Sequence, residues 1–174
     1  MKSLEVARLT GEGELKQFMS GLLERSPAQQ TEVMVTEWDR ALTRFANNGI
    51  HQNVAERNVS VRVRVVKDGK TGVASINQLN EGAATDVLKR AVAIADLQPR
   101  GEVVPMPGPA PAPLVEAWSD ATAAVTPEDR ADFVQTVCAK AGHAGLKAFG
   151  AYSTSAAQFA IANSLGVFHH QRST

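Results

Sequence analysis

The chain has 174 residues, 44% hydrophobic and 21% charged, which is ordinary for a soluble globular protein with a buried core. Its 18 basic and 18 acidic residues balance, so no overall charge attracts it to nucleic acid or to an anionic membrane. With one cysteine, a charged N-terminus and no apolar run as long as a membrane span, we expect a cytoplasmic protein.

The first half of the chain predicts one helix followed by strands. Residues 14–24 carry apolar side chains at helical spacing, and Pro27 ends this helix. Asn48-Gly49 and Asp68-Gly69 are typical of two-residue hairpin turns, which require antiparallel neighbours. The expected strand segments are residues 33–35, 42–46, 50–55, 59–66 and 71–76.

A second helix and a connector follow. Asn80 can cap the helix, whose apolar stripe extends from Ala84 to Ala95. Six of the eight prolines lie between Pro99 and Pro113, and such a composition predicts an extended connector without internal hydrogen bonds. The alternative is that this stretch is recognised by a proline-binding domain.

The last part of the chain predicts one helix and three strands. Thr126 is the expected cap, Pro127 occupies the first helical position and two acidic residues follow. The expected buried stripe of this helix is Phe133, Val134, Val137, Cys138 and Ala141, and Gly142 or Gly145 ends it. Strands are expected at residues 147–153, 156–162 and 167–171.

We therefore predict an α+β fold in which helices pack on one face of antiparallel meander sheets. Both halves contain a helix, a strand and a turn with Phe-Ala and Asn, which suggests two tandem helix-strand-strand units. The first unit is assigned to residues 1–98, the connector to 99–113 and a shorter second unit to 114–174. A sheet that stops there has an unpaired edge, which favours self-association.

The sequence lacks the familiar catalytic and metal-binding motifs. No histidine begins a His-Glu-x-x-His motif, and the adjacent His169 and His170 must point to opposite faces of a strand. Cys138 lies on a predicted buried stripe, where a thiol packs as a small apolar group. The sequence Gly69-Lys70-Thr71 joins strand to strand, so it is no phosphate loop. We therefore expect no catalytic residue and no metal ligand in this chain.

A basic group on the predicted Val-rich hairpin has two interpretations. Arg62, Arg64, Lys67 and Lys70 could contact nucleic acid phosphates, but no aromatic residues alternate with them for base stacking. We favour a solvated outer face of the sheet, and we expect no direct nucleic-acid binding.

Two segments resemble the TldD/PmbA family. They are residues 42–54 with the Val-rich hairpin that follows, and residues 160–167 with the following aromatic and histidine residues. The resemblance covers residues 14–174 and corresponds to the N-terminal part of the family. It implies a cytosolic protein of the group once called modulators of DNA gyrase, whose members are zinc metallopeptidase-like and act on unfolded or small peptides, including microcin maturation and antitoxin degradation.

The resemblance also implies a dimer, either of two identical chains or of a TldD-like and a PmbA-like chain. The family's catalytic His-Glu-x-x-x-His belongs to a later part of TldD-like chains and is absent from PmbA-like chains. Nothing in this sequence matches it. Zinc is therefore expected only in a parent assembly of the TldD-like type.

An open edge of a meander sheet can receive an extended peptide by strand addition, which would suit a peptidase that prefers unfolded chains. The candidate substrate-binding residues are the polar turn residues Asn47, Asn48, His51, Gln52, Asn163 and Ser164. The competing interpretation is that these asparagines only accommodate left-handed turn conformations.

Three functions stay open at this point. The leading one is a non-catalytic portion that frames a peptide or unfolded protein substrate and dimerises. The second is a non-enzymatic binding module that modulates DNA gyrase or another protein partner. The third is a structural protein whose proline connector is the interaction element.

Overall fold

The computed structural model describes residues 9–113 and 115–174. Along this part of the chain, groups of helices and groups of strands follow one another, which is an α+β order. The elements are α1 (Glu12–Glu24), β1 (Gln30–Ala46), β2 (Gly49–Lys67), β3 (Lys70–Ile76), α2 (Glu81–Leu97), α3 (Asp120–Ala123), α4 (Pro127–His143), β4 (Gly150–Asn163) and β5 (Phe168–Ser173).

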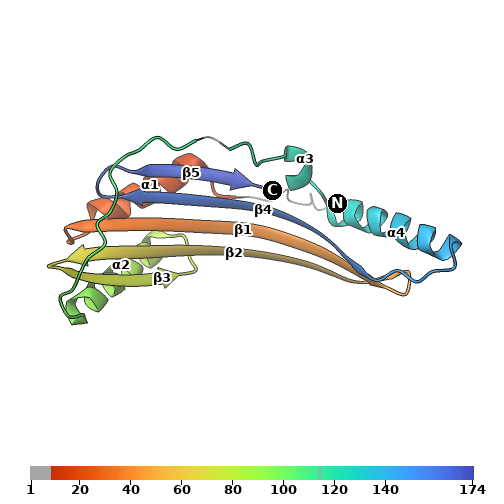
Figure 1. Ribbon diagram of the computed structural model, residues 1–174, viewed down its shortest axis with the longest axis horizontal. Coiled ribbons are helices and arrows are strands. Elements are labelled where there is room, and N and C mark those ends of the chain that lie inside the picture. The colour runs from red at the N-terminus through yellow and green to blue at the C-terminus, as the bar shows by residue number, and fades with distance from the viewer. Residues whose placement is uncertain (1–8, 114) are drawn as a thin grey trace.

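The strands form one antiparallel sheet in the order β3-β2-β1-β4-β5 (Figure 1). The central strand β1 pairs with β2 on one side and with β4 on the other, in each case along nearly its whole length. The predicted α+β class is confirmed. The strands of the two predicted units share this single sheet, which settles a point that the sequence left open.

The strands are fewer and longer than predicted. Residues 33–35 and 42–46 belong to β1, residues 50–55 and 59–66 to β2, and residues 150–153 and 156–162 to β4. The apolar alternation of β1 is interrupted because Glu37 and Thr43 occupy inward positions, where both are buried. A pattern search based on apolar residues therefore divides one strand into two.

The hairpin turns differ in how well they match the sequence prediction. Asp68 and Gly69 have φ values of 52° and 72°, as a type I′ turn requires. The β1–β2 turn lies one residue earlier than predicted: Asn47 and Asn48 have φ values of 50° and 61°, and Gly49 already pairs with Ala46. Asparagine tolerates the left-handed region, so the turn needs no glycine.

The helices lie on one face of the sheet. At the five-stranded end, α1 and α2 cover Val33 and Val35 of β1 and their neighbours, forming the main apolar core. At the other end, α4 covers Thr43 and Tyr152, which pair in register on the same face of their strands as those valines. The helix contributions to the buried interior are Leu15, Met19 and Leu22 of α1, Ala84, Val87, Leu88, Ala91 and Ala95 of α2, and Val134 and Cys138 of α4.

The ends of the helices follow the predicted signals. The Asn80 side chain accepts a hydrogen bond from the amide of Ala83, and Thr126 caps α4 with Pro127 at its start. The helix α4 ends in a Schellman arrangement with Gly145 at φ 70°, so Gly145 ends it and Gly142 does not. The predicted buried stripe of α4 is only partly right, because Phe133 is exposed and stacks on Tyr152 with ring centroids 4.5 Å apart. None of the described helices has the length and apolarity needed to cross a bilayer.

The proline-rich connector is extended, as predicted, but it is fastened to the sheet. In Figure 1 it crosses in front of the strands at their five-stranded end, whereas α1 and α2 lie behind them. Arg64 donates to the carbonyl of Val104 at 3.2 Å, and the Asn163 side chain donates to that of Pro107 at 2.8 Å. Met106 is only 4% exposed. The connector therefore covers one end of the face that the helices leave free.

Candidate functional site

The fold leaves the sheet face opposite the helices largely uncovered, and we call it the open face. Beyond the connector, no segment of the described chain crosses it (Figure 1). A shallow hollow of about 700 Å³ lies on it toward the β1–β2 turn. The side chains that line the hollow from this face are Arg40, Leu42, Arg44, Gln52, Val54, Glu56, Ser153 and Ser155.

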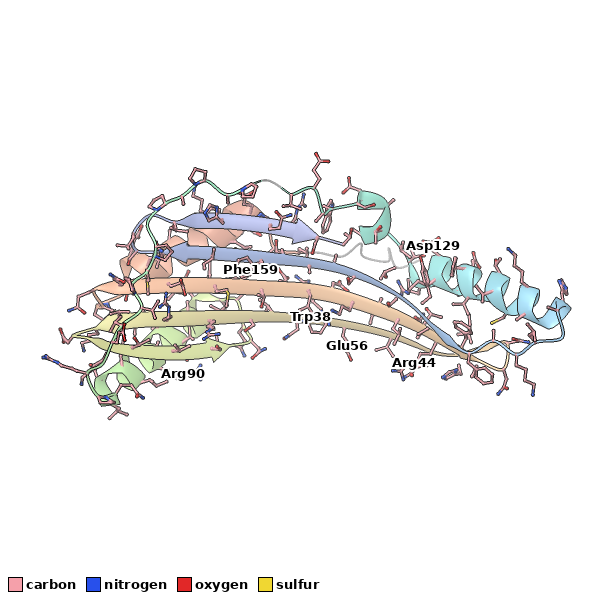
Figure 2. The ribbon with its side chains drawn as sticks, viewed as in Figure 1. Trp38, Arg44, Glu56, Arg90, Asp129 and Phe159 are labelled. Atoms are coloured by element: carbon pink, nitrogen blue, oxygen red, sulfur yellow. The ribbon has the colours of Figure 1, made fainter. Side chains whose placement is uncertain are left out.

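The open face combines aromatic, basic and polar groups. The guanidinium of Arg40 lies 4.7 Å from the centre of the Trp38 ring, a cation–π contact. Arg44 donates to the side-chain oxygen of Gln52 at 3.2 Å. Phe159 on β4 is 38% exposed, and Figure 2 shows it beside Trp38 along the sheet. Such a surface can hold an extended chain through both apolar contacts and hydrogen bonds.

The sheet has two unpaired edges at its three-stranded end. The edge strand β3 pairs only with residues 61–67 of β2, and β5 pairs only with residues 157–162 of β4. Within the described ranges, no strand pairs with the outer side of β2 over residues 49–60 or of β4 over residues 150–156. Backbone N–H and C=O groups on such edges can bond to another extended chain.

The structure divides the predicted substrate-binding residues into two groups. Asn163 pairs with Glu32 at one end of β1, whereas Gln52 pairs with Arg44 near the other end. At the usual rise per residue of a strand, these positions are roughly 40 Å apart. Asn47, Asn48, His51 and Gln52 therefore lie together around the β1–β2 turn, and Asn163 and Ser164 lie at the β4–β5 turn.

Three of these side chains form hydrogen bonds with backbone groups of the fold. The Asn48 amide donates to the carbonyl of Leu146 at 2.9 Å and accepts from the amide of Ala148. Asn163 is 3% exposed, and its side-chain oxygen accepts from the amides of Leu165 and Val167. Ser164 accepts from the amide of Thr31 at 3.0 Å. These bonds explain why the turns need such residues without any ligand.

The other three, Asn47, His51 and Gln52, are exposed near the unpaired edge of β2. The sequence prediction missed Trp38, Arg40 and Phe159 as open-face residues. The available signal was the two-residue spacing of Trp38, Arg40 and Leu42, which places all three on one side of a strand.

The histidines do not form a metal site. Across residues 9–113 and 115–174, no three His, Cys, Asp or Glu side chains are grouped in a way that could hold an ion. His170 lies on the helix-covered face, where its ring contacts Gln158 at 2.9 Å and Glu12 at 3.5 Å. Its neighbour His169 occupies the alternate position on β5, so it faces the other side of the sheet. Because a zinc site needs three or four converging ligands, these residues do not fit one, and we derive no hydrolytic step from them.

A buried carboxylate joins three elements beneath the sheet. Glu37 forms an ion pair with Arg57 and accepts hydrogen bonds from the Gln158 side chain at 2.6 Å and the Thr10 amide at 2.9 Å. Burial by itself would raise the pKa of Glu37, but the hydrogen bonds from Arg57, Thr10 and Gln158 hold that pKa below its ordinary value. All its oxygens are bonded, so Glu37 holds β1, β2 and β4 together and offers no free base.

The comparison of the sequence with protein families gives one match. A family model described as PmbA/TldA metallopeptidase domain 1 matches residues 31–95. This chain contains a PmbA/TldD domain 1. The matched residues comprise nearly all of β1 together with β2, β3 and most of α2. No curated protein sequence matches the chain significantly.

Solved structures share the fold of nearly the whole chain. TldE from Thermococcus kodakarensis has a TM-score of 0.81 and 17% identity, over 90% of this chain and 37% of that one. A candidate modulator of DNA gyrase from Thermotoga maritima has a TM-score of 0.78 and 16% identity, over 91% and 37%. Another from Bacteroides thetaiotaomicron has a TM-score of 0.71 and 15% identity, over 92% and 38%. At these identities the likeness establishes the shared fold, and the chain spans little more than a third of the length of each protein.

Proposed function

We propose that this chain is the non-catalytic, substrate-framing part of a TldD/PmbA-like metallopeptidase that acts on unfolded or small peptides. The observation that carries the proposal is the unpaired outer edge of β2 over residues 49–60, which borders the hollow on the open face. An extended peptide added to this edge would bond through backbone groups, so it would be bound with little dependence on its sequence.

The side chains beside this edge would add contacts to the bound peptide. Asn47, His51 and Gln52 are exposed at the turn end, and Val54 and Arg44 line the adjoining hollow. These groups supply hydrogen bonds and apolar contact without a demand for one particular peptide sequence. A folded protein has few free backbone groups to offer, so an unfolded chain is the substrate class that fits.

Hydrolysis would then be supplied outside this chain. The described residues contain no suitable set of zinc ligands, so zinc would be bound in the parent assembly if that assembly is of the TldD-like type. Dimerisation with an identical or a TldD/PmbA-like chain, and a cytoplasmic location, belong to the same proposal. The family match and the shared fold support it.

A non-enzymatic module that modulates DNA gyrase is the second candidate. This candidate is supported by two solved structures that share the fold and are described as candidate modulators of DNA gyrase. It predicts binding to a folded partner, whereas the leading proposal predicts binding to unfolded chains. The two functions therefore differ in a measurable preference.

The test measures fluorescence anisotropy of a fluorescein-labelled unfolded protein, reduced and carboxamidomethylated α-lactalbumin. Asn53→Pro and Val54→Pro remove neighbouring N–H groups of β2, one directed toward β1 and one directed outward. Proline is tolerated where the lost N–H group points away from the sheet. The variant that keeps the wild-type melting temperature is therefore the one that lost the outward N–H group. In that variant we expect the dissociation constant to rise severalfold.

His51→Ala serves as the matched side-chain control. It leaves every backbone donor in place, so a smaller loss of affinity is expected than for the well-folded proline variant. Wild-type binding to native α-lactalbumin, or equal affinity in the wild type and in the well-folded proline variant, would contradict strand addition. Binding to gyrase without binding to the unfolded protein would favour the second candidate.

A further inference from the structure

The charges of this neutral chain are unevenly distributed between the two ends of the sheet. Residues 40–55, which form the end of β1, the turn and the start of β2, contain no aspartate or glutamate. Residues 133–156, which form most of α4, the loop after it and the start of β4, contain none either. The two segments meet at the three-stranded end of the sheet, where Thr43 pairs with Asn53 and with Tyr152. We call these two segments the acid-free end.

The basic side chains of the acid-free end are exposed and lack ion pairs. They are Arg40, Arg44, Lys140 and Lys147. Among the described residues, no carboxylate lies within 4.0 Å of their charged groups. At the other end of the sheet, Arg64 pairs with Glu32 at 3.1 Å. Lys67 pairs there with Asp96 at 2.7 Å. The acid-free end therefore carries positive charge that the described chain does not compensate.

Two acidic residues of the strands mark the limit of this region. Glu56 follows the acid-free end on β2 and is the cross-strand partner of Arg40. Figure 2 shows Arg44 farther toward the β1–β2 turn than Glu56. Asp39 precedes the acid-free end on β1, and its alternate position places it on the helix-covered side of the strand. Repulsion of a negatively charged ligand is thus weakest toward the turn.

The positive groups lie beside the edge at which we propose peptide binding. Arg44 Nη1 donates to Gln52 Oε1 at 3.2 Å, so the guanidinium reaches from β1 over β2. A peptide strand added to β2 would lie about 4.8 Å beyond it, which is less than the Debye length of about 8 Å at physiological salt. Lys147 belongs to the loop that Asn48 fastens to the β1–β2 turn. A carboxylate on the added peptide would therefore be attracted by charges that salt only partly screens.

Exposed apolar side chains lie at the same end of the sheet. Ile50 at the start of β2 is 39% exposed, and Leu146 and Phe149 in the loop before β4 are 64% and 63% exposed. The hydrogen bonds of Asn48 hold this loop against the turn, so the apolar groups stay near the β2 edge. Covering such groups with apolar side chains of a ligand is favourable, because it removes their surface from water.

We propose that the β2 edge prefers unfolded peptides in which acidic side chains are interspersed with apolar ones. This inference rests on the proposed function, because it names the substrate class of the same edge. Backbone hydrogen bonds bind any extended peptide, and the acid-free end discriminates between peptides by their charge. A lysine-rich or arginine-rich peptide is disfavoured there because like charges repel.

The test compares three blocked peptides that differ only in charge. They carry Glu, Gln or Lys at three positions between the same Val and Thr residues, and each competes with the labelled unfolded α-lactalbumin. The inhibition constant of the Glu peptide should be at least about tenfold lower than that of the Lys peptide, with the Gln peptide between them. Raising the salt concentration from about 0.1 M to about 1 M should reduce this difference, because the Debye length falls from about 10 Å to about 3 Å.

Three exposed substitutions locate the preference. Arg44→Gln and Lys147→Gln should each raise the inhibition constant of the Glu peptide about two- to fivefold and leave that of the Gln peptide unchanged. Lys89→Gln on α2, at the other end of the sheet, is the matched control, because it removes the same charge from the chain. It should leave all three inhibition constants unchanged.

The outcomes separate this inference from the proposed function. Equal inhibition by the three peptides, each weakened in the well-folded proline variant of β2, would overturn the charge preference and leave the proposed function intact. Failure of all three to compete would overturn the inference, and the proposed function falls with it if the unfolded protein also does not bind. An effect of Lys89→Gln as large as that of Arg44→Gln would assign the preference to total charge and contradict a role of the acid-free end.

Discussion

The helix α2 approaches the sheet very closely at Gly72, and replacement of this glycine by alanine gives a sharp test of the fold. A Cβ at this position of β3 would lie 2.0 Å from the carbonyl oxygen of Ala91 and 2.6 Å from the amide nitrogen of Ala95. Both atoms belong to the backbone of α2, so no rotation of a side chain can relieve the clash. We therefore expect Gly72→Ala to move the whole helix.

The size of the effect follows from this geometry. Cβ atoms essentially never lie within 3.0 Å of such atoms, so α2 must retreat by about 1 Å. A gap of that size forfeits a quarter to a half of each dispersion contact along the buried face of α2. Overpacking typically costs about 1–3 kcal/mol, and the restricted unfolded chain returns up to about 1 kcal/mol. The difference is a net loss of about 2 kcal/mol, which lowers the melting temperature by about 4–8 °C for a chain of this size.

The assay is thermal and urea denaturation followed by circular dichroism. Gly13→Ala in α1 is the matched control, because its added Cβ would meet nothing within 4 Å. Alanine is the better helix former, so this control should be stabilised by up to about 1 kcal/mol. A Gly72→Ala variant that melts at or above the wild-type temperature would show that α2 does not pack this closely on β3.

Two further predictions concern buried polar groups. The pKa of Glu37 is lower in the folded state than in the unfolded chain. Its contribution to the free energy of unfolding is therefore complete at a pH above the ordinary glutamate pKa of about 4.3. This contribution is lost as the pH falls through the lower pKa of the folded state. Glu37→Gln should therefore flatten the dependence of unfolding free energy on pH in this acidic range, and an unchanged slope would refute the assignment. Asn163→Asp removes the donor to Pro107 and should cost about 1–3 kcal/mol in urea denaturation, whereas the exposed Asn47→Asp should cost much less. Equal losses in the two asparagine variants would contradict the structural role of Asn163.

Local signals predicted the element boundaries that depend on neighbouring residues. Asn80, Thr126 and Gly145 mark helix ends because capping and left-handed termination involve only residues a few positions away. Asp68-Gly69 sets a turn for the same reason. The strand interiors were less predictable, because Glu37 looks solvent-exposed in the sequence until Arg57 and Gln158 are known to bond to it.

The candidate site was predicted only in part. Asn47, His51 and Gln52 do lie together near an unpaired edge, as expected for residues joined by one short hairpin. Asn163 and Ser164 lie at the far end of the sheet, because the antiparallel pairing of β1 with β4 sets their distance. Their substrate-binding role, like the division at residues 99–113, stays a prediction.

The sequence by itself determined the α+β class, the helix starts, the hairpins and the family resemblance, since each depends on short-range chemistry or on a recognisable motif. Only the tertiary structure decided that β4 pairs with β1 and so unites both halves of the chain in one sheet. It also decided that the connector fastens across the open face and that Asn48 holds the loop before β4 against the β1–β2 turn. These features join residues that are far apart in the sequence. Local periodicity does not distinguish between the possible strand pairings, so the free energy of packing decides between them.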